Sequence, residues 1–116
     1  MISPTVARLF LGASLLPFLW FALRDQILHF VARKVSIVEN GLHLLLAFLL
    51  TIVIGQAMLF QTRWVAVALL MFVVCGAADE YIFHRGIPET EHNIHAKEHF
   101  ALLLFVSVFA AIMWIR

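Results

Sequence analysis

The chain has 116 residues, of which 64% are hydrophobic and 13% charged, and its mean hydropathy is +1.01. Soluble domains contain about 45–50% apolar and about 25% charged residues, and a small domain buries only part of its surface, so a soluble globular fold is excluded and lipid is the expected solvent. The net charge of +1, without a basic tail, argues against nucleic acid as a partner.

The first predicted element is a helix over residues 5–29. Arg8 and the apolar run behind it resemble the start of a signal peptide, but the run leads into Arg24 and Asp25 without a small-residue cleavage site. We therefore expect a retained helix. Pro17 predicts a kink rather than a break, because membrane helices tolerate proline where neighbours satisfy the backbone.

Three further apolar stretches follow, each close to the 20 or so residues that a helix needs to cross a bilayer. The predicted helices cover residues 37–60, 64–84 and 90–116. Gln61, Thr62 and Arg63 are expected to turn the chain between the first two of them. Before the last, Gly86 and Pro88 indicate a loop, and Thr90 is the expected N-cap.

The short connections predict an all-α integral membrane fold, an antiparallel up-down bundle of four transmembrane helices in a single domain over residues 1–116. Both termini and the middle connection then lie at one membrane face, called face Y, and the other two connections lie at face X. Face X has five basic residues, namely Arg24, Arg33, Lys34, Arg85 and Lys97, whereas face Y has Arg8, Arg63 and Arg116. The positive-inside rule therefore favours face X as cytoplasmic in this multi-pass protein.

All histidines and all carboxylates of the chain fall in the face X half. The six histidines are His29, His43, His84, His92, His95 and His99, and the seven carboxylates are Asp25, Glu39, Asp79, Glu80, Glu89, Glu91 and Glu98. Ionisable groups at membrane depth are costly and usually face the bundle interior together. The distribution predicts a polar centre just inside face X.

Each predicted helix carries an acidic residue followed four residues later by a histidine. The pairs are Asp25 and His29, Glu39 and His43, Glu80 and His84, and Glu91 and His95. Residues four apart share a helix face, and at about 100° per residue Glu91, His92, His95, Glu98 and His99 lie within about 120° of one another. We expect the four pairs to converge at one level.

Imidazoles and carboxylates together form the ligand set of iron, zinc and manganese sites. The number of candidates suits two transition-metal ions, with iron preferred to zinc or manganese. The predicted metal ligands are Glu39, His43, Glu80, His84, Glu91, His95, Glu98 and His99, and the residues expected to orient them or to serve as alternative ligands are Asp25, His29, Asp79 and His92. The i,i+4 spacing differs from the Glu-x-x-His motif of soluble di-iron bundles, so no role is transferred from those proteins.

The preferred interpretation is a metal-dependent membrane enzyme that acts on a lipid or another apolar substrate from the bilayer. Iron would serve an oxidoreductase and zinc a hydrolase. The sequence assigns no separate catalytic residue. Membrane lipids are the expected surroundings, and a homo-oligomer or a partner membrane subunit is compatible with the pattern.

Three other interpretations are open at this stage. The first is a haem-binding electron-transfer or anchor subunit with two axial histidines, for example His43 and His95. The second is a metal or proton transporter, since acid–histidine chains mark ion pathways. The third is a structural subunit whose polar face docks a soluble partner.

Overall fold

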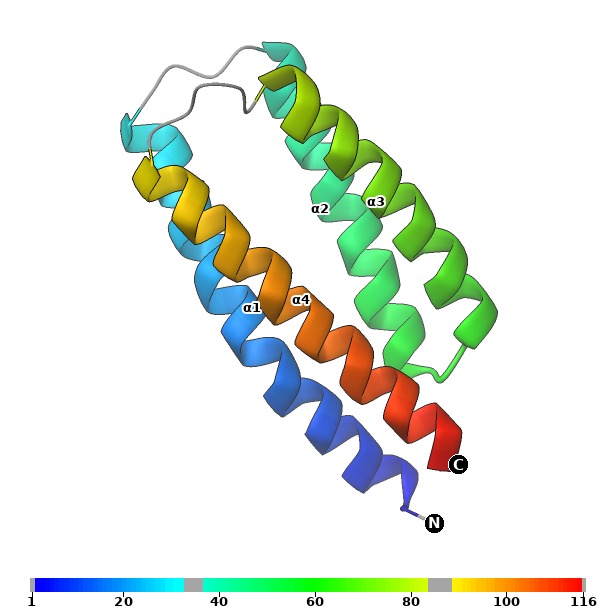
Figure 1. Ribbon diagram of the computed structural model, residues 1–116. Coiled ribbons are helices and arrows are strands. Elements are labelled where there is room, and N and C mark those ends of the chain that lie inside the picture. Colours follow the sequence, from blue (N-terminus) through cyan, green and yellow to red (C-terminus); the bar gives the residue numbers. More distant parts are fainter. Residues whose placement is uncertain (1, 33–36, 84–88, 116) are drawn as a thin grey trace. The chain divides into compact units, whose positions relative to one another are not determined.

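All regular elements in the part of the chain that the computed structural model describes are helices (Figure 1). The backbone is described for residues 2–32, 37–83 and 89–115, and the side chains for residues 2–27, 37–82 and 92–115. The helices are α1 (Pro4–Ala32), α2 (Ile37–Met58), α3 (Thr62–Phe83) and α4 (Glu89–Ile115). All four are long and apolar enough to cross a membrane, which confirms the prediction of four long apolar helices.

The helix bounds agree with the prediction to within a few residues. Helix α1 continues through Pro17, as expected for a proline that does not break a membrane helix. Helix α4 begins at Glu89, so Thr90 lies inside its first turn and is not the N-cap that the sequence suggested. The predicted end of the third helix, His84, lies outside the described residues.

The turn between α2 and α3 lies two residues earlier in the chain than predicted. Phe60 has a φ of 57°, in the left-handed region that non-glycine residues seldom adopt. Its N–H donates to the Ala57 carbonyl at 3.0 Å, and the Gln61 N–H donates to the Gln56 carbonyl at 2.9 Å. This pair of bonds is a Schellman motif, which satisfies the last carbonyls of α2 and ends the helix two residues early.

The described helices form two compact units, one made of α1 and α4 and the other of α2 and α3. Within each unit the two helices run antiparallel (Figure 1). We call these units the α1/α4 pair and the α2/α3 pair and describe each by itself. The interpretation of residues 1–116 as one domain stays a prediction.

The α1/α4 pair is held together by an apolar seam at helical spacing. The buried apolar residues of α1 are Ala7, Leu11, Leu15 and Phe18, and those of α4 include Ala101, Phe105, Phe109 and Ile112. Successive members lie three or four residues apart, which places them on one helix face. Alanine at this seam allows the two backbones to approach, as is common between membrane helices.

The α2/α3 pair has a similar seam made of smaller side chains. Its buried apolar residues are Leu49, Val53 and Ala57 on α2 and Val65 and Ala68 on α3. The spacing is again three or four residues. Both pairs therefore bury one narrow stripe of each helix and leave the other faces outside the seam.

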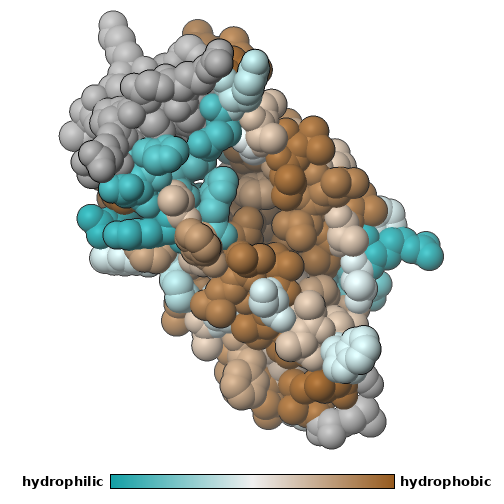
Figure 2. Space-filling view, viewed as in Figure 1, coloured by the Kyte–Doolittle hydropathy of each residue, from teal (hydrophilic) through white to brown (hydrophobic). Residues whose placement is uncertain are grey.

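Large apolar side chains cover most of the remaining helix surface. Figure 2 shows hydrophobic residues over most of the visible surface and hydrophilic residues gathered over the N-terminal part of α4. On this helix, Phe100 is 74% exposed and Trp114 is 91% exposed. Surfaces of this kind are rare on soluble proteins, so the four helices suggest a multi-pass membrane protein.

Candidate metal centres

In the α2/α3 pair, one histidine lies against two buried carboxylates. His43 Nε2 is 3.2 Å from Oδ1 and 3.3 Å from Oδ2 of Asp79, and it is 3.9 Å from Oε1 of Glu39. Glu39 and Asp79 are each 2% exposed. We call these three residues the α2/α3 cluster; α2 supplies the histidine and the glutamate, and α3 supplies the aspartate.

The α1/α4 pair contains a cluster with the same three residue types. His95 Nδ1 is 3.3 Å from Oδ2 of Asp25 and 3.9 Å from Oε2 of Glu98. Asp25 is buried, and His95 and Glu98 are partly buried. In this α1/α4 cluster, α4 supplies the histidine and the glutamate, and α1 supplies the aspartate.

The carboxylates of both clusters continue the apolar seams of their helices. Asp25 follows Ala7 by 18 residues, which is about five turns at 3.6 residues per turn, so the two share one face of α1. Asp79 follows Val65 by 14 residues, about four turns, and continues the seam of α3 in the same way. The helix packing that buries the seam therefore buries these carboxylates as well.

The glutamates and histidines follow a common rule on α2 and α4. At about 100° per residue, Glu39 and Glu98 fall within the arc of their helix's seam, and His43 and His95 fall about 40° beyond its edge. Glu39 is four residues before its histidine and Glu98 is three residues after, and both spacings place the two side chains on one face. Each histidine can thus reach across to the partner helix.

The distances suit a shared metal ion. In each cluster, one candidate ligand atom per residue can be chosen so that all three lie within 4.8 Å of one another. Two ligands of one tetrahedral ion at about 2.0–2.2 Å are separated by about 3.4 Å. The His–Asp separations of 3.2 and 3.3 Å already match this value, and the glutamate oxygens lie within a small side-chain adjustment of it.

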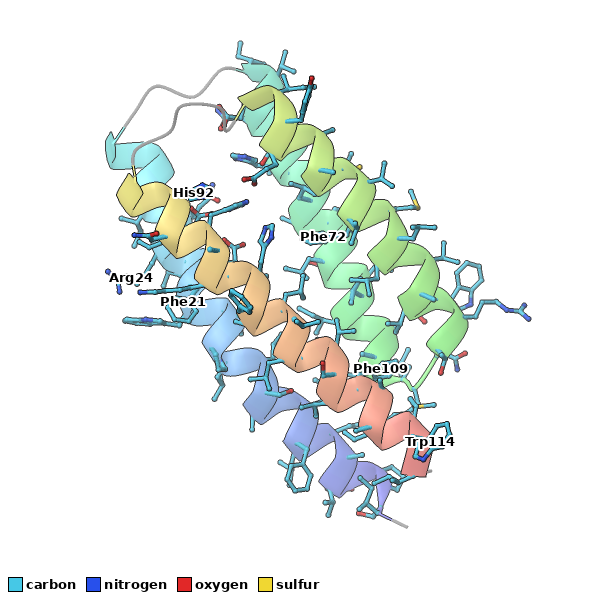
Figure 3. All side chains as sticks on the ribbon, viewed as in Figure 1. Phe21, Arg24, Phe72, His92, Phe109 and Trp114 are labelled. Atoms are coloured by element: carbon cyan, nitrogen blue, oxygen red, sulfur yellow. The ribbon has the colours of Figure 1, made fainter. Side chains whose placement is uncertain are left out.

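Two further histidines among the described residues of α4 are exposed. His92 is exposed; it and Arg24 lie toward one end of the pair, and Trp114 lies at the other end (Figure 3). The His99 ring is exposed and lies 4.4 Å from the His95 ring, tilted by 54°. His95 and His99 each offer a ligand nitrogen within 4.8 Å of the other, so the predicted ligand His99 can also serve an ion bound at His95.

The predicted ligands are distributed unevenly over the two clusters. Glu39, His43, His95 and Glu98 lie in them. Glu80 is partly buried and adjoins Asp79 on α3. The described side chains do not include those of His29, His84 and Glu91, so three of the four predicted acid–histidine pairs lie wholly or partly outside the described residues.

Asp25 and Asp79 are more central to the two clusters than the sequence predicted. Both were expected to orient a ligand or to serve as alternative ligands, yet the histidine of each cluster lies nearer to its aspartate than to its glutamate. The sequence did contain a signal for this arrangement. On α1 and α3, continuing the three- or four-residue spacing of the apolar seam toward face X leads to these two aspartates. The i,i+4 rule missed them as partners of the histidines, because it relates residues of one helix only.

The residue chemistry defines what each cluster can bind. With a neutral imidazole, one histidine and two carboxylates carry two negative charges and offer one nitrogen and several oxygen ligands. Such a set suits divalent iron, manganese or zinc. No protein-family model, curated protein or solved structure matches the chain, so its chemistry is argued from these residues alone.

Proposed function

We propose that this chain is a multi-pass membrane metalloprotein, an antiparallel up-down bundle that holds two transition-metal ions near face X and acts as an oxidoreductase or hydrolase on an apolar substrate. Iron is preferred to zinc or manganese. The observation that carries the proposal is the presence, in both helix pairs, of a histidine within 3.3 Å of a buried aspartate and 3.9 Å of a glutamate.

Charge balance supports a divalent cation in each cluster. Two carboxylates beside a neutral imidazole leave two negative charges in helices that are otherwise apolar, and uncompensated charge is costly in such surroundings. One divalent ion neutralises the cluster. A salt bridge to a protonated histidine would neutralise only half of it.

A ligand set of three protein side chains leaves coordination positions open, as in catalytic metal sites. A bound iron would supply oxidation chemistry, and a bound zinc would activate water for hydrolysis. The exposed apolar side chains of the helices favour a substrate that arrives through the bilayer, such as a lipid. The more numerous basic residues at face X favour the cytoplasmic side for the centre.

The geometry gives less support to the alternatives. His43 and His95 each lie against two carboxylates, which an axial haem ligand does not need, and they belong to different helix pairs. The buried residues along the rest of both seams are apolar, which disfavours a proton or metal path along them. A structural role for the polar face predicts no bound metal.

Elemental analysis of the protein purified in detergent tests the proposal directly. We expect close to two transition-metal ions per chain, with less metal in His43→Ala and in His95→Ala. His92→Ala is the matched control, because His92 is an exposed histidine of the same helix as His95. An absorption spectrum of the same sample distinguishes iron from haem and from zinc.

Wild-type protein without stoichiometric metal, after purification and after loading with iron, zinc or manganese, would sink the proposal. An equal loss of metal in all three histidine variants would do the same, because it would mean that the clusters have no special part in binding. A Soret band would replace the proposal with the haem interpretation.

A further inference from the structure

We infer that the two clusters are separate metal sites, each binding one divalent transition-metal ion through ligands of its own helix pair. This inference rests on the proposed function but goes beyond it, because a metal centre of two ions could also be held by ligands shared among all four helices. The sequence predicted that shared arrangement.

Each cluster is complete by itself. Glu39, His43 and Asp79 come from α2 and α3 only, and Asp25, His95 and Glu98 come from α1 and α4 only. Within each set the three ligand atoms lie within 4.8 Å of one another. Three protein ligands with a remaining open position are sufficient for a zinc-type site, so neither cluster needs a residue from the other pair to hold an ion.

Both clusters also share one layout. An aspartate lies on the seam face of one helix, and a glutamate lies on the seam face of the other. A histidine on the same helix as the glutamate, at the edge of the seam, contacts the aspartate of the partner helix. The helix–helix seam fixes this layout, because it brings the aspartate to the histidine. Since each pair has its own seam, each positions its own ligands.

The charge of each cluster points to one ion per pair. Asp79 and Glu39 neutralise one divalent cation, and Asp25 and Glu98 neutralise another. One divalent ion in each pair therefore leaves both clusters neutral.

Titration of the metal-free full chain with Co²⁺ tests the inference. Co²⁺ bound by nitrogen and oxygen ligands absorbs visible light, so the titration gives the number of ions bound per chain. The test compares the wild type with Asp25→Asn, with Asp79→Asn and with the double variant. Asparagine keeps the shape of the side chain and removes its charge. Gln26→Ala is the control, because Gln26 is an exposed neighbour of Asp25.

We expect the wild type and Gln26→Ala to bind two Co²⁺ per chain, each single variant to bind one, and the double variant to bind none tightly. The spectra of the two single variants should add up to that of the wild type. Loss of both ions in either single variant would overturn the inference and leave the proposed function intact, because it would show one shared centre. A wild type that binds no Co²⁺ would refute the proposed function itself.

A folding defect is separated from a ligand effect by two measurements. Circular dichroism of each metal-free variant should retain the helical signal of the wild type. Asp79→Glu and Asp25→Glu keep the carboxylate, so each should recover part of the Co²⁺ binding that the asparagine variant loses. A glutamate variant that binds no better than its asparagine counterpart, with normal helical content, counts against the aspartate as a ligand and overturns the inference.

Discussion

The α2/α3 and α1/α4 clusters contain the same residue types, but they differ in how far they are removed from water. The side chains of Glu39, His43 and Asp79 are 3%, 13% and 3% exposed, whereas those of Asp25, His95 and Glu98 are 10%, 16% and 18% exposed. The comparison shows how similar ligand sets acquire unequal environments.

The apolar seams of the two pairs also differ, in the size of the side chains that they bury. The α1/α4 seam buries the aromatic residues Phe18, Phe105 and Phe109, whereas the largest apolar residue that is buried in the described α2/α3 seam is Leu49. The pair with the more exposed cluster therefore has the larger apolar contact. We infer that packing contributes more to the α1/α4 pair and that bound metal contributes more to the α2/α3 pair.

The largest effect is expected from removing an aromatic side chain from the α1/α4 seam. Phe105→Ala should destabilise the pair by about 3 kcal/mol, because Phe105 is 1% exposed and its loss leaves a cavity. Thermal unfolding in detergent measures the change. Phe100→Ala, at a position that is 74% exposed on the same helix, is the control and should have little effect. Equal destabilisation by both variants would mean that the seam is misassigned.

Replacing the glutamates tests whether the difference in burial makes the two clusters differ in metal affinity. Glu39→Gln should lower metal affinity in the α2/α3 cluster by about 100-fold and Glu98→Gln in the other by about 10-fold, a span found when groups around metal sites are altered. The effect is smaller at Glu98 because water can replace the lost oxygen there. Competition with a coloured chelator gives both affinities. Asn93→Lys, which adds one positive charge at an exposed position of the same helix as Glu98, controls for the change in charge.

The order in which the ions leave the wild-type protein provides a third test. We expect a chelator to extract the α1/α4 ion first, with an affinity about 10-fold weaker, or about 1.4 kcal/mol. Attraction between ion and carboxylate is stronger where water is excluded, as it is around Glu39 and Asp79. Asp25→Asn and Asp79→Asn protein identify which ion leaves at which step. Extraction of both ions at one chelator concentration would remove the distinction between the clusters.

The smallest effect is expected at the turn that joins α2 and α3. Phe60→Gly should be more stable than Phe60→Ala by about 1 kcal/mol, because both variants lose the ring and only alanine keeps a Cβ in the left-handed conformation. Thermal unfolding of the two variants measures the difference. Metal affinity should be the same in both. Equal stability would indicate that the turn relaxes to another conformation.

Local patterns in the sequence were sufficient for the helices. The long apolar runs and the polar residues between them predicted four helices, because the need to satisfy backbone hydrogen bonds in lipid leaves a helix as the only structure for such a run. The left-handed Phe60 was beyond this reasoning. Nothing in its side chain favours that conformation, which arises where the two helices on either side must turn back on each other.

The sequence by itself also predicted that the histidines and carboxylates lie in one half of the protein. It predicted His43 and His95 as metal ligands through their spacing from acidic residues on the same helix. This part could be predicted because i,i+4 neighbours are set by the geometry of a single helix.

Only the tertiary structure decided that Asp79 faces His43 and that Asp25 faces His95. Asp25 and His95 are 70 residues apart in the chain, and no local rule pairs the first helix with the last. Their contact depends on which helices pack together and on the register of the seam between them. Side chains along that whole seam determine both, so the partner of each histidine is a property of the helix pair rather than of either helix alone.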